Sequence, residues 1–206
     1  MTRAGGLIGA IFGMSIGCAL AEPPRELKTL SEKSLPENAA FAGQFRQALQ
    51  WADKLGVNIV ILSEDSRPIA DGGGYDDRIY ASAYVIENGK AKRRWVVQDS
   101  VLDCALDHEA AFTGASGLLV TDLNGDDVSE AWVSYRLACR GGIDPAEMKI
   151  IMRQGERKYA MRGEDKDPTL MVGGSYEFDA AFKEAPAIFR IYAEALWRLH
   201  LADDRR

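Results

Sequence analysis

Cysteine and histidine are scarce in this chain, and its one long apolar run lies at the start. The 206 residues include three cysteines and two histidines. No C-x-x-C pair is present, which excludes a thioredoxin-like dithiol enzyme, and isolated cysteines are a poor basis for a metal site. Beyond Leu20 no segment approaches the roughly 20 apolar residues that a membrane-spanning helix needs. We therefore expect no membrane span in the mature chain.

Positive charge is also in deficit. The chain has 25 Lys and Arg residues against 31 Asp and Glu residues, a net charge of −6. An acidic protein has no broad electrostatic attraction to phosphate backbones, so no nucleic-acid partner is expected. One basic run, from Lys90 to Arg94, follows a turn signal. It fits a solvated strand edge that discourages pairing with another chain.

The first residues have the layout of a secretory signal peptide. Arg3 precedes an apolar, Gly-rich run that ends in the small-x-small pattern Ala19-Leu20-Ala21. This predicts a signal peptide over residues 1–21 and an exported protein, with the periplasm as the expected location. The alternative is lipoprotein anchoring at Cys18, which Ser15 fits less well because a leucine is usual at that position.

Two cysteines remain once that segment is removed, Cys104 and Cys139. In an exported protein a pair of cysteines favours a disulfide, and this one would enclose residues 122–130. The alternative is two buried free thiols.

The rest of the chain divides into a leader and one domain. Residues 22–38 contain Pro23, Pro24 and Pro36 among many charges, which predicts an extended or weakly ordered leader. Residues 39–206 are long enough to bury a core and form a single globular domain.

Short apolar runs separated by turn signals predict a series of β-hairpins. Residues 41–55 also fit helical spacing, but we favour a strand over Gln47–Trp51 because the β-branched run Val57–Leu62 follows. Asn88-Gly89 is a strong type I′ turn signal. The predicted pairs are 47–51 with 57–62, 78–86 with 91–98, 117–121 with 131–137, and 148–153 with 158–162.

The pattern changes near the C-terminus. Apolar residues recur at steps of three and four, which predicts an amphipathic helix with Pro186 near its first turn. The members of this face are Phe182, Ala185, Phe189, Tyr192, Leu196 and Leu199. The predicted fold class is therefore α+β, an antiparallel β-meander of hairpins closed by a C-terminal amphipathic helix.

The most specific motif is an acidic loop within the third hairpin. Oxygen-bearing side chains recur at Asp122, Asn124 and Asp126, and the carbonyl of Val128 and the carboxylate of Glu130 complete a ligand set. Ca²⁺ takes about six to eight oxygen ligands in flexible geometry, whereas Mg²⁺ demands a stricter octahedron. The motif predicts a structural Ca²⁺ site, against the alternative of a solvated turn built from Asx-turns.

The loop departs from an EF-hand, because Val133 stands where a bidentate Glu is required and a strand is predicted to follow. It resembles the strand-loop-strand calcium sites of FG-GAP and VCBS-type repeats instead. In those repeats a glycine is usual where Asp127 stands, although Asp tolerates a left-handed conformation better than most residues.

A longer resemblance covers most of residues 45–200. It rests on the run from Val120 to Trp132, on Cys139, on Met148–Met152 and Lys158–Gly163, and on the closing aromatic helix. These features are similar to a family of uncharacterised bacterial exported proteins, some labelled surface polysaccharide biosynthesis proteins. The resemblance implies an envelope location and an envelope polysaccharide or protein as partner, but no reaction.

No catalytic residues are assigned. The Gly-rich run from Asp71 to Asp77 lacks the context of a phosphate loop and reads as a connection, with a second cation site as the alternative. His108 and His200 are read as structural, although His108 is also a possible general base or metal ligand. The leading hypothesis is a non-enzymatic exported binding or structural module. The alternatives are a carbohydrate-active enzyme with paired carboxylates and a partner domain that acts through a sheet edge.

Overall fold

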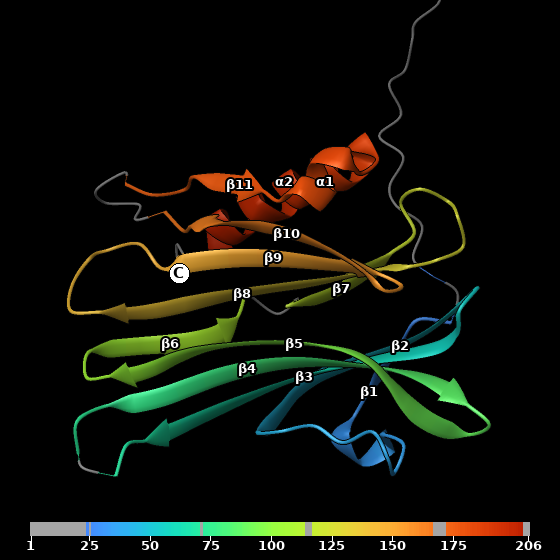
Figure 1. Cartoon of the computed structure of the whole chain (residues 1–206), viewed down its shortest axis with the longest axis horizontal. Helices are drawn as coiled ribbons and strands as arrows, with labels where there is room; N and C mark the ends of the chain where they lie inside the picture. The colour runs from blue at the N-terminus through green and yellow to red at the C-terminus, as the bar shows by residue number, and fades with distance from the viewer. Residues whose placement is uncertain (1–23, 25, 71, 114–116, 167–171, 204–206) are drawn as a thin grey trace, which may run out of the picture.

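Two antiparallel sheets stacked face to face, with helices on the outer face of the second, make up the fold (Figure 1). The computed structural model describes residues 24, 26–70, 72–113, 117–166 and 172–203. The predicted signal peptide, residues 1–21, and the alternative anchor Cys18 lie outside them. This arrangement confirms the predicted α+β class and the succession of antiparallel hairpins closed by a C-terminal helix.

The first sheet is a simple meander, since its strands follow one another in chain order. The predicted strand over Gln47–Trp51 is confirmed, because Leu49 and Trp51 face the core between the sheets while Ala48 faces the opposite side. A helix over the same residues would not give this alternation. The strands are β1 (Lys28–Leu30), β2 (Gln44–Asp53), β3 (Gly56–Pro68), β4 (Tyr75–Glu87) and β5 (Lys90–Cys104).

The second hairpin turns as the sequence predicts. Asn88 and Gly89 have φ angles of +52° and +75°, and a type I′ turn requires positive φ at both positions. The basic run that follows begins β5, the last strand in the order of the first sheet. There Lys92 pairs with Glu87 at 3.2 Å and Arg94 with Glu156 at 2.7 Å.

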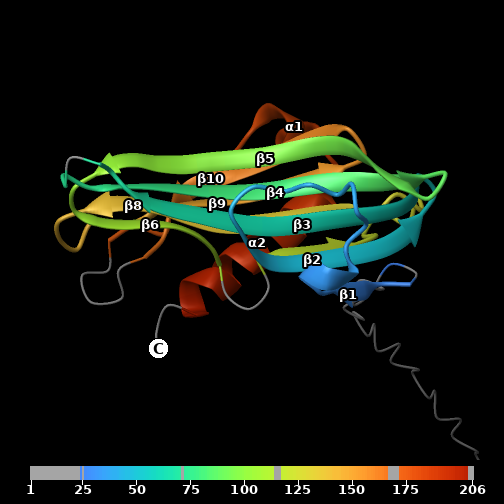
Figure 2. The ribbon, with the colours of Figure 1, turned by 90° about the horizontal axis from the view of Figure 1, so that it is seen from below.

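Part of the predicted leader is attached to the first sheet. β1 pairs with β2, and the segment that follows it crosses the outer face of the sheet (Figure 2). The amide of Asn38 exchanges two hydrogen bonds with the backbone of Ala91, at 2.8 and 3.0 Å. Phe41 and Phe45 pack on this face over Ile59 and other buried residues. The strand Lys28–Leu30 and the short 3-10 helix η1 (Glu32–Ser34) thus give part of the leader regular structure, and Leu30 and Leu35 cover apolar surface.

The second sheet is centred on β8, which is hydrogen-bonded along both edges. β9 pairs with one edge, and β7 and β6 pair in turn with the other. The sequence analysis did not predict β1, β6 or β11, because each is short and lacks a clear apolar alternation. The strands are β6 (Asp107–Phe112), β7 (Leu118–Thr121), β8 (Glu130–Arg140), β9 (Glu147–Gln154), β10 (Arg157–Glu164) and β11 (Tyr176–Phe178).

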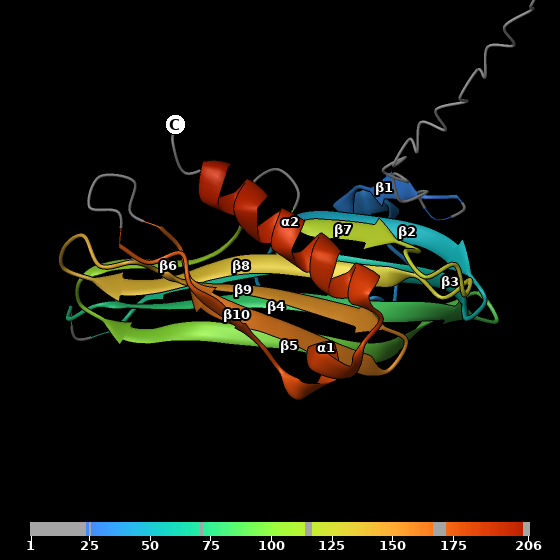
Figure 3. The same cartoon turned by 90° about the horizontal axis from the view of Figure 1, so that it is seen from above.

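Two helices, rather than the single one predicted, cover the second sheet (Figure 3). They are α1 (Ala180–Glu184) and α2 (Ala187–Asp203), and Pro186 lies directly before the second. Asp179 caps α1 by accepting a hydrogen bond from the backbone N–H of Phe182 at 2.9 Å. Within the described chain, neither helix is both long and apolar enough to cross a membrane.

The buried face of α2 differs from the predicted one near its C-terminal end. Steps of three and four counted from Phe182 place Leu199 on the apolar face, but Leu199 is 50% exposed. At 3.6 residues per turn the face that buries Phe189, Ala193 and Leu196 continues to His200, so Leu199 lies at its margin, whereas Trp197 is buried. The buried positions of α2 are Phe189, Ala193, Leu196, Trp197 and His200.

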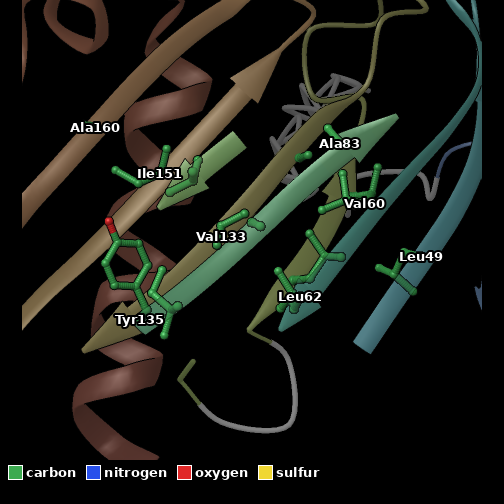
Figure 4. Packing of buried hydrophobic residues seen from close by; sticks show 14 of the residues in the cluster. Leu49, Val60, Leu62, Ala83, Val133, Tyr135, Ile151 and Ala160 are labelled. Carbon is green, nitrogen blue, oxygen red and sulfur yellow. The ribbon is translucent and has the colours of Figure 1, made fainter. Parts of the chain in front are cut away.

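The main core lies between the two sheets (Figure 4). Val60 and Leu62 of the first sheet face Val133, Tyr135 and Ile151 of the second. Alternate residues of the second sheet point the other way and pack beneath the helices, and these include Trp132, Met148, Ile150 and Met152. Consequently β8 is buried on both faces from Glu130 to Ala138.

The predicted disulfide joins the two sheets. Cys104 ends β5 in the first sheet, Cys139 lies near the end of β8 in the second, and their sulfurs are 2.07 Å apart. The bridge encloses the acidic loop in sequence but lies at the opposite end of β8 in space. Glu130 and Cys139 are about 30 Å apart along the strand, at roughly 3.3 Å per residue.

Replacing Cys104 and Cys139 together by serine should lower the free energy of unfolding by on the order of 4 kcal/mol in the chain-entropy model, because the bridge closes a loop over a sequence separation of 35. Urea unfolding of the protein measures this. Reductant should lower the midpoint of the parent protein and leave that of the double variant unchanged. Equal midpoints for the oxidised and reduced parent would contradict a stabilising bridge.

Candidate metal centre

The acidic loop joins β7 to β8 at one end of the stacked sheets (Figure 3). Two left-handed residues shape it, Gly125 with φ of +67° and Asp127 with φ of +64°. Asp127 thus adopts a left-handed conformation, which Asp tolerates better than most residues. The strand expected after the loop is present, since β8 begins at Glu130.

Hydrogen bonds within the loop hold its polar side chains in place. Asp122 Oδ2 accepts the N–H of Asp127 at 3.2 Å, and Asp126 Oδ1 accepts the N–H of Val128 at 2.9 Å. Asn124 Oδ1 accepts the N–H of Asp126 at 3.3 Å. These are the turn contacts of the solvated-turn alternative, so by themselves they do not distinguish a plain turn from an ion site.

Glu130 differs from the other acidic residues of the loop because it is fully buried, with 0% exposure. Its Oε2 accepts hydrogen bonds from the Thr121 hydroxyl at 2.7 Å and from the Leu123 N–H at 2.9 Å. The Thr121 hydroxyl in turn accepts the indole N–H of Trp132 at 2.9 Å. One oxygen of Glu130 is thereby held by the core, and Oε1 is turned to the loop.

Burial raises the pKa of Glu130 to about 7. Its hydrogen bonds with Leu123 and Thr121 lower the pKa, and the nearby charges of Asp122 and Asp126 raise it further. Among the described residues no cationic side chain forms an ion pair with it. A buried carboxylate beside two others is the kind of group that a cation stabilises.

A residue that the sequence analysis missed, Gln154, completes the site. Its Nε2 lies 3.1 Å from the carbonyl oxygen of Val128, 3.3 Å from Glu130 Oε1 and 3.5 Å from Asn124 Oδ1. Both carboxylate oxygens of Asp126 are also near, at 3.3 and 3.2 Å. Gln154 ends β9, and only its register opposite Glu130 brings it to the loop.

Five oxygens from four of the predicted ligands thus surround one point. Asp122, the fifth predicted ligand, lies close enough for its charge to raise the pKa of Glu130, and its Oδ1 is buried without a hydrogen-bond partner. We call these five oxygens the cage. To reach Ca²⁺–oxygen distances of about 2.3–2.6 Å, each would have to move inward by somewhat less than 1 Å. No cluster of three or more His, Cys, Asp or Glu side chains that could hold a metal occurs in the described residues. Most of the converging oxygens belong instead to one carboxylate, an amide and a backbone carbonyl.

The loop also contacts the first sheet. The N–H of Lys54 donates to the carbonyl of Asp127 at 2.8 Å, and the N–H of Ser129 donates to Asp53 Oδ2 at 3.1 Å. Asp53 Oδ1 accepts the N–H of Leu55 within the turn between β2 and β3. The acidic loop therefore links the two sheets at the end opposite the disulfide.

The Gly-rich run does not assemble a second cation site from its described aspartates. Asp76 pairs with Arg78 at 2.8 Å, and hydrogen bonds from the Asp103 N–H and from Arg78 lower its pKa. Asp77 is buried and lies 2.5 Å from His108 Nδ1. Asp71 lies outside the described residues.

Each histidine has a structural contact. The ring of His108 pairs with Asp77 and stacks on Tyr75 with centroids 4.2 Å apart. His200 is buried in the last turn of α2, with its ring 3.3 Å from the Thr113 hydroxyl and its carbonyl accepting from Arg136 at 2.9 Å. These contacts agree with the structural reading of both residues.

A groove of about 650 Å³ beside β10 and β11 gathers carboxylates, as a carbohydrate-active enzyme would require. Glu147, Glu164 and Glu177 line it together with Asp179. Asp179 is already engaged, since its two oxygens accept the backbone N–H groups of Ala160 and Phe182 at 2.9 Å each. Glu147 forms an ion pair with Lys149 at 3.0 Å.

Comparisons of this chain with family models, with curated proteins and with solved structures find no match. The resemblances drawn from the motifs stay predictions, and the assignment of function rests on the geometry above.

Without divalent ions, the contribution of Glu130 to stability should fall as pH rises. The folded protein holds the proton up to a pKa of about 7, whereas the ordinary value is 4.5. The favourable contribution is therefore complete below pH 4.5 and is lost by about pH 7. A shift of this size corresponds to at most about 3 kcal/mol.

Urea unfolding in EDTA between pH 4 and 8 tests this expectation. The difference in unfolding free energy between the parent protein and Glu130→Gln isolates the contribution of Glu130, because the other titrating groups are common to both. A difference that does not change with pH would contradict the raised pKa.

Proposed function

We propose that the protein is an exported, non-enzymatic binding or structural module that holds Ca²⁺ in the 122–130 loop. The observation that carries the proposal is the convergence of five loop oxygens on the amide nitrogen of Gln154. The predicted ligands are Asp122, Asn124, Asp126, Val128 and Glu130.

The chemistry of the cage favours Ca²⁺ over Mg²⁺. Its atoms are hard oxygens of three kinds, namely carboxylate, side-chain amide and backbone carbonyl, which Ca²⁺ accepts in irregular arrangements. Mg²⁺ prefers an octahedron at about 2.0–2.1 Å and retains its waters, so it gains less from a cage of this width. Cations that need nitrogen or sulfur find no such ligand among the residues that surround Gln154 Nε2.

The position of the cage supports a structural role for the ion. The loop is hydrogen-bonded to the β2–β3 turn of the first sheet, and β8 and β9 of the second sheet supply Glu130 and Gln154. An ion here would neutralise the buried Glu130 and fix three segments to one another. It would act at one end of the sandwich, as the disulfide does at the other.

Export is supported by the signal-peptide layout and by the Cys104–Cys139 bridge, which an oxidising compartment favours. On this proposal the protein works in the periplasm or elsewhere in the cell envelope. Its partner is an envelope polysaccharide or protein, as the family resemblance implies.

A carbohydrate-active enzyme is the second candidate, and the carboxylate groove beside β10 and β11 is the observation that favours it. Glu164 lies opposite Glu147 in the β9–β10 register, so two carboxylates meet at this groove. Hydrolysis of an envelope polysaccharide that is lost in Glu164→Gln but retained in Asp126→Asn would establish this alternative.

Millimolar CaCl₂ should raise the melting temperature of the mature, oxidised protein by several degrees relative to EDTA, and MgCl₂ should raise it less. Ligand linkage predicts about 3–4 kcal/mol at 100 to 1,000 times the dissociation constant. Thermal unfolding followed by circular dichroism measures the shift.

Asp126→Asn should abolish most of the calcium-dependent shift with little effect in EDTA, because it removes a charge from the cage and keeps the side-chain shape. Asp144→Asn, in an exposed loop away from the cage, is the matched control and should keep the full shift. Equal destabilisation by Asp126→Asn in calcium and in EDTA would refute the ion site.

A further inference from the structure

Gln154 reaches the acidic loop from a different part of the chain. It lies on β9 directly opposite Glu130 of β8. The preceding residue, Arg153, points into the space between the sheets, where its guanidinium stands 5.0 Å from the ring of Trp95. Because neighbouring residues of a strand face opposite sides, this contact fixes Gln154 on the side of the loop.

The amide nitrogen of Gln154 has more acceptors than it can serve. An amide NH₂ carries two protons, yet five oxygens lie 3.1 to 3.5 Å from it. At least three of these contacts therefore lack a proton from the amide. The NH₂ group, whose hydrogens carry partial positive charge, stands where a cation would satisfy all of these oxygens.

The same amide also bears a carbonyl oxygen, a group that Ca²⁺ commonly takes as a ligand. The glutamine side chain has three rotatable bonds, so its amide can turn while the backbone of β9 stays in place. A single rotation of the side-chain amide would withdraw the nitrogen from the cage and bring the carbonyl oxygen toward it. The NH₂ group of the amide therefore suits the ion-free site, and its carbonyl oxygen suits the ion-bound site.

We propose that Gln154 is a ligand-exchanging residue of the calcium site: its Nε2 occupies the cation position when the ion is absent, and its Oε1 coordinates the ion when it binds. This inference rests on the proposed function. It assigns a sixth ligand to the site, contributed by β9, and makes ion binding alter a contact between the β7–β8 loop and the β9–β10 hairpin.

Substitutions that strengthen or remove the oxygen ligand test the proposal, with calcium affinity measured by titration calorimetry on the mature, oxidised protein. Gln154→Glu keeps an oxygen at the same reach and adds a charge, so affinity should rise about tenfold. Gln154→Met keeps the length and removes both amide groups, so affinity should fall about tenfold. Gln98→Glu and Gln98→Met, on the exposed part of β5, are the matched controls and should bind like the parent protein.

The exchange itself has a direct readout. In EDTA the side-chain NH₂ resonances of Gln154, assigned by their loss in Gln154→Met, should show slowed hydrogen exchange because the cage holds the amide. Saturating CaCl₂ should shift them and speed their exchange, and in Asp126→Asn they should respond little to CaCl₂.

Two results would overturn the inference while leaving the proposed function intact. One is calcium binding by Gln154→Met as tight as, or tighter than, that of the parent protein. The other is a parent protein that binds calcium while the Gln154 NH₂ resonances do not move. If the parent protein binds no calcium at all, the proposed function fails, and the exchange proposed for Gln154 fails with it.

Discussion

The burial of β8 on both faces is the constraint on which the rest of the structure depends. This strand is hydrogen-bonded along both edges and buried from Glu130 to Ala138, so its position in the fold can change little. One face packs into the core between the sheets through Val133 and Tyr135, and the other packs beneath α2 through Trp132. The positions of both sheets and of the helix are therefore set by this strand.

The same strand explains why a carboxylate can be buried at its first residue. Glu130 is held by Thr121 and Leu123, and the hydroxyl of Thr121 is held by the indole of Trp132 in the helix-facing core. The carboxylate of Glu130 is thus fixed at the end of β8, next to the acidic loop. Such a group stays protonated or takes a cation, and both outcomes follow from desolvation.

The two links between the sheets lie at opposite ends of β8. Cys139 is bridged to the first sheet at one end, and at the other the loop before Glu130 is hydrogen-bonded to the β2–β3 turn. Contacts this far apart share no neighbours, so their effects on stability should be additive. An ion in the loop and the disulfide would then secure the sandwich independently.

Local chemistry in the sequence was enough for several elements. Asn88-Gly89 specified a turn because few residues accept positive φ, and the β-branched run Val57–Leu62 specified a strand. The spacing of Asp122, Asn124 and Asp126 specified a tight loop, which their own hydrogen bonds to the backbone now hold. Periodicity also identified the C-terminal helix, although Leu199, which was predicted on its apolar face, is exposed.

The sequence by itself determined the fold class and the acidic loop, because turn residues and apolar alternation act locally, and it favoured the pairing of Cys104 with Cys139, which the structure contains. Only the tertiary structure decided that Gln154 completes the cage and that Glu130 is buried with a raised pKa. Strand register brings together residues 24 positions apart, and desolvation depends on every element packed around a group. Neither the strand register nor the desolvation can be inferred from a short stretch of sequence, and both determine which ion this site can bind.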